Sequence, residues 1–184
     1  MRLFVVALLV ALATPLAAAP SSGGVTPAPD PAVAVLARLS GKDFDVAYMR
    51  LVVPAHEEAV EVAMAATLWA DHTDLLKWNQ RMIERKNAQV RQMLTLLGSV
   101  GAGPTQRYAG VATPTVKKVR ALRGGALERT YMTYLITHFD RNVAFSRMAA
   151  GKGSPGVKAL GAAIVQVEAG EATMLRGWMK KWYP

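Results

Sequence analysis

Apolar residues recur at three- and four-residue intervals along four long stretches of the chain, which is the spacing of amphipathic helices. Neither the sustained apolar–polar alternation of a β-strand nor the Asn-Gly and Asp-Gly pairs of tight hairpin turns occurs in the sequence. The pattern therefore predicts an all-α protein. The expected long helices cover residues 44–69, 73–97, 126–149 and 157–182.

The segments between these helices are rich in glycine and proline. "GSVGAGP" follows the second long helix and "GKGSPG" follows the third. Within the long middle connection, Pro114 is placed for the first turn of a short helix, and another short helix is expected over 32–39. Pro54 predicts a kink in the first long helix or a joint between two helical segments. Two helix pairs joined by one long connection predict a four-helix bundle.

The two halves of the chain look like repeats, at about 43–98 and 125–183. The pair Tyr48-Met49 recurs as Tyr131-Met132, at an offset of 83 residues, and "RMIERKNAQVRQM" aligns with "AIVQVEAGEATML" at an offset of 82. A repeated helical hairpin would form a bundle with a pseudo-twofold axis and bring equivalent residues together across it.

The N-terminus has the features of a secretory signal peptide. Arg2 supplies a positive charge, the apolar run that follows is too short to span a bilayer, and small alanines precede Pro20. An uncleaved N-terminal anchor is the alternative. We expect export to the periplasm or the extracellular space. The expected organisation is a signal peptide at 1–19, a flexible tether at 20–30 and a helical domain at 31–184.

The net charge of +9 and the absence of cysteine change this picture in two ways. Without disulfides, stability must come from packing. A basic surface favours anionic partners or a membrane surface, while export argues against nucleic acid. The densest basic run, 116–123, also fits a solvated helix face. Neither the partner nor the oligomeric state follows from the sequence.

Catalytic signatures are missing from the sequence. It has no cysteine nucleophile, no Gly-x-Ser-x-Gly elbow, no phosphate-binding glycine loop and no Glu-x-x-His of a diiron bundle. His72 fits the start of the second long helix, with Asp71 or Thr73 as its N-cap. Glu168 and Glu171 are candidate binding residues, although their spacing is more typical of a solvated helix face. We therefore expect a protein that is not an enzyme.

Three segments resemble a known family: "VVPAHEEAVEVAM", "YLITHFDRNVAFSRM" and the C-terminal "MLRGWMKKWYP". Together, residues 44–183 resemble the family catalogued as domain of unknown function 305. Its members are exported bundles, and some are periplasmic copper-binding proteins. The resemblance implies a ferritin-like antiparallel four-helix bundle made of two repeated helical hairpins. It also implies one His- and Met-rich motif in each half.

This chain departs from the family motif at most of the positions that bind metal. One histidine remains in each half, His56 and His138, and Met93 is the one family methionine that remains. The resemblance makes these three the candidate metal ligands, and we expect both imidazoles to face the inside of the bundle. The other motif positions are mostly hydrocarbon, at Val52, Ala55, Val62, Leu135, Phe139 and Phe145.

The loss of ligands favours a protein without a resident cofactor. Imidazole and thioether groups bind copper, whereas hydrocarbon side chains have no lone pair to donate. The first hypothesis is therefore an exported, non-enzymatic helical bundle with an eroded His/Met site and a binding or interaction role. The alternative is a periplasmic copper-binding protein with a reduced site.

Overall fold

The computed structural model describes residues 30–108 and 112–184. These residues form six helices and no strand, which confirms the predicted all-α class. The expected signal peptide and all of the expected tether except Asp30 lie outside the described residues. No helix in the described part is long and apolar enough to cross a membrane. The helices are α1 (Pro31–Arg38), α2 (Gly41–Thr67), α3 (Thr73–Ser99), α4 (Pro114–Ala121), α5 (Gly124–Lys152) and α6 (Pro155–Trp182).

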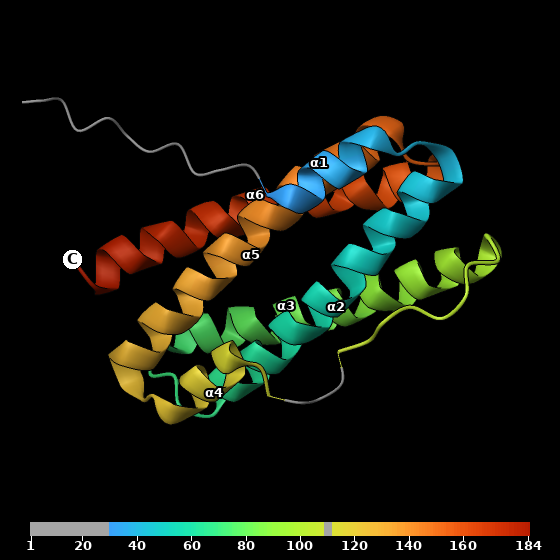
Figure 1. The fold of residues 1–184 in the computed structure, drawn as a ribbon. Coiled ribbons are helices and arrows are strands. Elements are labelled where there is room, and N and C mark those ends of the chain that lie inside the picture. The colour runs from blue at the N-terminus through green and yellow to red at the C-terminus, as the bar shows by residue number, and fades with distance from the viewer. Residues whose placement is uncertain (1–29, 109–111) are drawn as a thin grey trace, which may run out of the picture.

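The four long helices pack as two consecutive pairs. α2 turns back as α3, and α5 turns back as α6, with α2 also packed against α5 (Figure 1). The short α1 lies against α5 and α2, and the short α4 lies against α2 and α5. The direct packing of α3 against α6 is slight by comparison, so the polar contacts between these two helices carry particular weight.

The first long helix runs through Pro54 as one helix, so the expected joint between two helical segments does not occur. Proline removes one backbone hydrogen bond from the helix interior. Val52, Val53 and His56 are fully buried on both sides of it, and their packing holds the backbone helical despite that loss.

The apolar core is divided into two clusters. One surrounds Trp78, Tyr131 and Leu135, and the other surrounds Phe44 and Met93. In each long helix, the residues that separate the two clusters are polar and buried. The core is therefore two apolar compartments with a polar layer between them.

Carboxylates from one half cap helix N-termini in the other half. Asp45 of α2 accepts hydrogen bonds from the backbone N–H of Ser154 at 3.1 and 3.3 Å, where α6 begins. Glu128 of α5 accepts from the N–H groups of Asp71 and His72 at 2.6 and 2.8 Å, where α3 begins. Both carboxylates satisfy unpaired N–H groups and complement the helix dipole. Asp45 and Glu128 are 83 residues apart, the offset of the expected repeat.

This arrangement corrects the expected capping of α3. The N-cap is His72 itself, not Asp71 or Thr73, and its side chain makes no capping bond. The buried Glu128 from the other half performs that task instead. A cap supplied by a distant helix leaves no local sequence signal.

The N-terminal α1 is tied to the domain at both ends. Asp30, which we expected in the tether, accepts a hydrogen bond from the Ala32 N–H at 2.8 Å and pairs with Arg141. At the other end, the Lys152 ammonium donates to the backbone oxygens of Leu36 and Leu39 at 2.6 and 2.7 Å.

Two glycines of α6 should respond oppositely to alanine. A Cβ at Gly161 would lie 2.7 Å from the Ser146 backbone oxygen and 2.8 Å from Ala149 Cβ, so α5 and α6 would have to separate. A Cβ at Gly170 meets nothing within 4 Å. We expect Gly161→Ala to lower the free energy of unfolding by about 1–3 kcal/mol, and Gly170→Ala to raise it by about 0.5–1 kcal/mol. Urea unfolding measures both, and equal effects would contradict the close packing at Gly161.

Candidate functional site

The polar layer between the two apolar clusters is the main candidate site, because every long helix contributes to it. Each member lies on the buried face of its helix and is at most 8% exposed. Its members are His56 from α2, Lys86 and Gln89 from α3, His138 and Asn142 from α5, and Glu168 from α6.

An ion pair between Lys86 and Glu168 joins α3 to α6 within this layer. Lys86 Nζ lies 2.6 Å from Glu168 Oε1 and 5.1 Å from the centre of the Phe139 ring. The two residues are 82 positions apart, the offset of the expected repeat, so charges of opposite sign stand at equivalent positions. Burial lowers the pKa of Lys86 and raises that of Glu168, and their contact opposes both shifts.

The two buried histidines are joined through Asn142. His56 Nε2 lies 3.0 Å from the Gln89 side-chain oxygen and 3.5 Å from Lys86 Nζ. We assign the ring proton to Nε2 because the contact with the oxygen is the shorter one, and Nε2 then donates to Gln89. His56 Nδ1 then accepts from Asn142 Nδ2 at 3.4 Å, and His138 Nε2 accepts from the same nitrogen at 2.8 Å. The ring centres are 5.7 Å apart, which confirms that both imidazoles face the inside.

Burial keeps both imidazoles neutral. It holds the pKa of His56 and of His138 well below the usual value, and the nearby Lys86 ammonium lowers both further. A neutral imidazole has one nitrogen lone pair, and in both rings that lone pair points at Asn142. The layer therefore satisfies its own histidines.

The third candidate ligand is not part of this layer. Met93 is fully buried but belongs to the apolar cluster around Phe44, one helical turn beyond Gln89. The structure thus brings two of the three proposed metal ligands together and places the third among hydrocarbon side chains.

Glu168 and Glu171 do not form the solvated face that their spacing suggested. Glu168 is fully buried in its ion pair. The Glu171 side chain is 11% exposed, pairs with Arg85 and accepts from Trp78 Nε1 at 3.0 Å. Both carboxylates therefore link α6 to α3. Each carboxylate has one oxygen with internal partners, whereas Glu168 Oε2 and Glu171 Oε2 are buried without a hydrogen-bond partner. Their binding role stays a prediction.

A second polar cluster lies where α3 begins and α6 ends. His72 Nδ1 is 2.6 Å from Glu128 Oε2, and the same carboxylate accepts from the Tyr183 hydroxyl. The His72 ring stacks on Trp182 with centres 3.9 Å apart. Burial alone would raise the pKa of Glu128, but the hydrogen bonds from His72, Tyr183 and Asp71 outweigh it and lower the pKa. Because this carboxylate caps α3, the cluster closes the end of the bundle.

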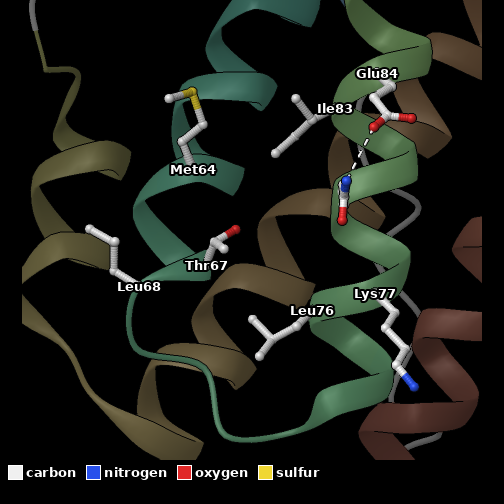
Figure 2. Close-up of a pocket in the computed structure, with 8 residues that line it drawn as sticks. Met64, Thr67, Leu68, Leu76, Lys77, Ile83 and Glu84 are labelled. Carbon is white, nitrogen blue, oxygen red and sulfur yellow. Dashed lines mark hydrogen bonds between the residues drawn. The ribbon is translucent and has the colours of Figure 1, made fainter.

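An apolar groove of about 620 Å³ is exposed between α2 and α3. Figure 2 shows Met64 and Leu68 on the α2 side and Leu76 and Ile83 on the α3 side. Leu68 is 73% exposed, more than any other large apolar residue in the described part of the chain. The rim carries Lys77 and Glu84.

The basic run at 116–123 is used largely for structure. Val116 and Val119 are fully buried in the core. Arg120 pairs with Glu61, and the Arg123 guanidinium lies 4.0 Å from the centre of the Trp69 ring. Only Lys117 and Lys118 of this run remain as ordinary surface cations on α4.

Comparison with known proteins finds one matching family and several solved structures with a similar fold. Residues 17–97 match the family described as Domain of unknown function (DUF305). The predicted resemblance to DUF305 is confirmed. No curated protein sequence matches the chain.

Solved structures share the fold at low sequence identity. CopM in its Cu(I)-bound form is 18% identical, with a TM-score of 0.67 over 76% of this chain and 98% of CopM. A DUF305 fragment from Deinococcus radiodurans is 21% identical, with a TM-score of 0.67 over 74% of this chain and 95% of the fragment. A DUF305 protein from Streptomyces coelicolor is 18% identical, with a TM-score of 0.65 over 74% of this chain and 91% of that protein.

The polar layer of this chain does not fit a resident copper ion. Both imidazole lone pairs already accept from Asn142, and a fixed ammonium already balances Glu168. A copper ion would have to displace these hydrogen bonds and stand near the Lys86 charge. Among the described residues, no group of three or more His, Asp or Glu side chains is arranged to hold a metal ion.

Sequence reasoning missed Lys86 and Asn142 as members of the site. Lys86 lies four residues from both Met82 and Val90, so the spacing of the buried stripe on α3 already includes it. The equivalent position in the other half is Glu168, and an acid opposite a base at equivalent repeat positions is a usable signal. The one signal for Asn142 in the sequence is its position four residues after His138, which places both residues on the same face of the helix.

The buried imidazoles predict a loss of stability in mild acid. The unfolded chain takes up a proton on each ring below about pH 6.5, while the folded chain does not. The unfolded state thus binds more protons, so stability falls as pH falls, by up to about 1.4 kcal/mol per pH unit for each ring. Glu168, whose pKa is raised, contributes the opposite slope.

The contribution of the His138 ring is the difference in the pH dependence of the unfolding free energy between the wild type and a variant without that ring. We expect His138→Gln to have a shallower loss of unfolding free energy between about pH 6.5 and pH 5 than the wild type, because one buried imidazole is gone. Urea unfolding across this range tests it. His72→Gln, at a half-exposed position outside the layer, is the control, and an unchanged slope in His138→Gln would contradict the prediction.

Proposed function

We propose that this chain is an exported, non-enzymatic DUF305 protein that acts by binding a partner and holds no copper in its core. The proposed architecture is a ferritin-like antiparallel four-helix bundle of two repeated hairpins, over 31–184, behind a signal peptide and tether. The contacts at the repeat offset support the two-hairpin arrangement, namely Lys86 with Glu168 and the paired caps Asp45 and Glu128.

One observation supports the absence of core copper above all others. The Lys86 ammonium is fully buried beside His56 and Glu168, at 3.5 Å from His56 Nε2 and 2.6 Å from Glu168 Oε1. A buried cation paired in this way already provides the positive charge that the layer requires. The layer therefore stays folded and neutral without a metal ion.

The wild-type protein should bind copper only weakly. We expect titration with Cu(I) or Cu(II) to give an affinity no tighter than that of a generic basic protein with three histidines. Chelator should leave the melting temperature unchanged, because no native contact depends on the metal. Competition with a chromophoric chelator measures the affinity, and differential scanning calorimetry measures the stability.

A copper-binding protein with a reduced site is the alternative, and the convergence of His56 and His138 favours it. Sub-micromolar copper binding that is abolished by His56→Ala or His138→Ala would establish it. His72→Ala is the matched control, since weak binding at that half-exposed ring would not involve the core. Tight binding lost only in the two core variants would overturn the proposal of a copper-free core.

The binding role is supported by the groove between α2 and α3. Its apolar walls fit the apolar face of a helix, and its rim carries Lys77 on a protein with net charge +9. Glu84 on the rim already accepts a hydrogen bond from Gln80. We propose that the occupant is an acidic amphipathic helix of a partner protein.

Two synthetic peptides of equal length test this binding surface. Both carry leucine at the same helical positions, with glutamate elsewhere in one and lysine in the other. We expect the acidic peptide to bind and the basic peptide not to bind, as measured by fluorescence anisotropy. Leu68→Glu should weaken binding at least about tenfold, since it places a charge in the apolar wall.

The control is Val35→Glu, which changes an exposed apolar residue on α1 outside the groove. It should leave peptide binding unchanged. Equal binding of both peptides, or equal loss in both variants, would reduce the interaction to nonspecific charge attraction and contradict the proposal. Self-association of the protein that Leu68→Glu abolishes would assign the groove to a second copy of the chain instead.

A further inference from the structure

Asn142 occupies the point at which the two buried imidazole lone pairs meet. Its side-chain nitrogen lies 2.8 Å from His138 Nε2 and 3.4 Å from His56 Nδ1. An amide NH₂ group has two hydrogens, so it can donate to both rings. The amide nitrogen thus stands where one metal ion bound by two imidazoles would stand.

The outer contacts of His56 match those of a metal ligand. A histidine that binds metal through one ring nitrogen almost always donates its other N–H to an oxygen acceptor, which fixes the tautomer. His56 Nε2 donates to the Gln89 oxygen at 3.0 Å, which leaves the lone pair of Nδ1 as the one that could bind a metal ion. The tautomer that copper would require is therefore already set.

Two further features complete the position. His138 is 8% exposed, so one edge of the layer approaches the surface. The Lys86 ammonium lies 3.5 Å from His56 Nε2, so it places a positive charge beside the layer's histidines. Any cation placed between the rings would be repelled by this charge.

We propose that Asn142 and Lys86 together prevent Cu(I) from binding between His56 and His138, and we call this blocked two-histidine site the closed position. Asn142 closes it by filling the space and occupying both lone pairs, and Lys86 closes it by its charge. This inference rests on the proposed copper-free core and adds the residues responsible for it. Two nitrogen ligands suit Cu(I), whereas Zn(II) takes four ligands and should bind more weakly at this position.

The test replaces Asn142 and Lys86, singly and together, and titrates each variant with Cu(I) under anaerobic conditions. We expect Asn142→Ala to bind Cu(I) at least about tenfold more tightly than the wild type. Asn142→Ala/Lys86→Leu should bind more tightly still, because leucine has a similar volume but no charge. Lys86→Leu alone should stay near the wild type, since Asn142 still occupies both rings.

The position is identified by removal of a ring. Adding His138→Ala to Asn142→Ala should return Cu(I) affinity to the wild-type level, and Zn(II) should raise the melting temperature of Asn142→Ala less than Cu(I) does. If Asn142→Ala folds only when Cu(I) is present, that result supports the proposal. If it folds under neither condition, Asn142→Ser, which keeps a small polar group in the layer, takes its place in the same titration.

The outcomes separate this inference from the proposed function. If Asn142→Ala or Asn142→Ser folds and binds Cu(I) no better than a copper-free wild type, the inference about Asn142 and Lys86 is wrong. The proposed copper-free core is unaffected by that result. Tight core copper in the wild type itself overturns both, because an open site needs no residue to be removed.

Discussion

The ion pair between Lys86 and Glu168 is the contact on which the centre of the molecule depends. It crosses from α3 to α6, two helices that otherwise pack only slightly against each other, and both of its side chains are buried. A buried charge is tolerated only when it is paired, and removing one partner of such a pair costs about 3–5 kcal/mol. Lys86 and Glu168 therefore also fix the register of the two hairpins relative to each other.

The polar layer divides the core and gives it specificity in place of raw stability. A core of hydrocarbon alone would allow the helices to slide by a turn with little change in burial. Here a one-turn slide would separate His56 from Gln89 and leave buried polar groups without partners. The apolar clusters on either side drive the folding, and the layer selects one arrangement.

The internal partners of the polar layer bear on where this protein can bind a ligand. The histidines of the layer already have Asn142 and Gln89 as hydrogen-bond partners, which is the basis of the proposed copper-free core. The groove between α2 and α3 contains Leu68, the most exposed large apolar residue in the described part of the chain, and the proposed binding role rests on this groove. The chain shares the fold of CopM and of the DUF305 structures, although its sequence lacks most of the metal ligands that the family resemblance implies.

The helices could be predicted from the amino-acid sequence, because the spacing of apolar residues and the positions of glycine and proline are local properties. The family resemblance and the inward orientation of His56 and His138 could be predicted in the same way. Packing between helices establishes that Glu168 is buried opposite Lys86, that Asn142 joins the two rings, and that Glu128 caps α3. These contacts join residues on different helices. Neither the charge of a side chain nor its spacing along one helix reveals whether that side chain faces water or a partner on another helix.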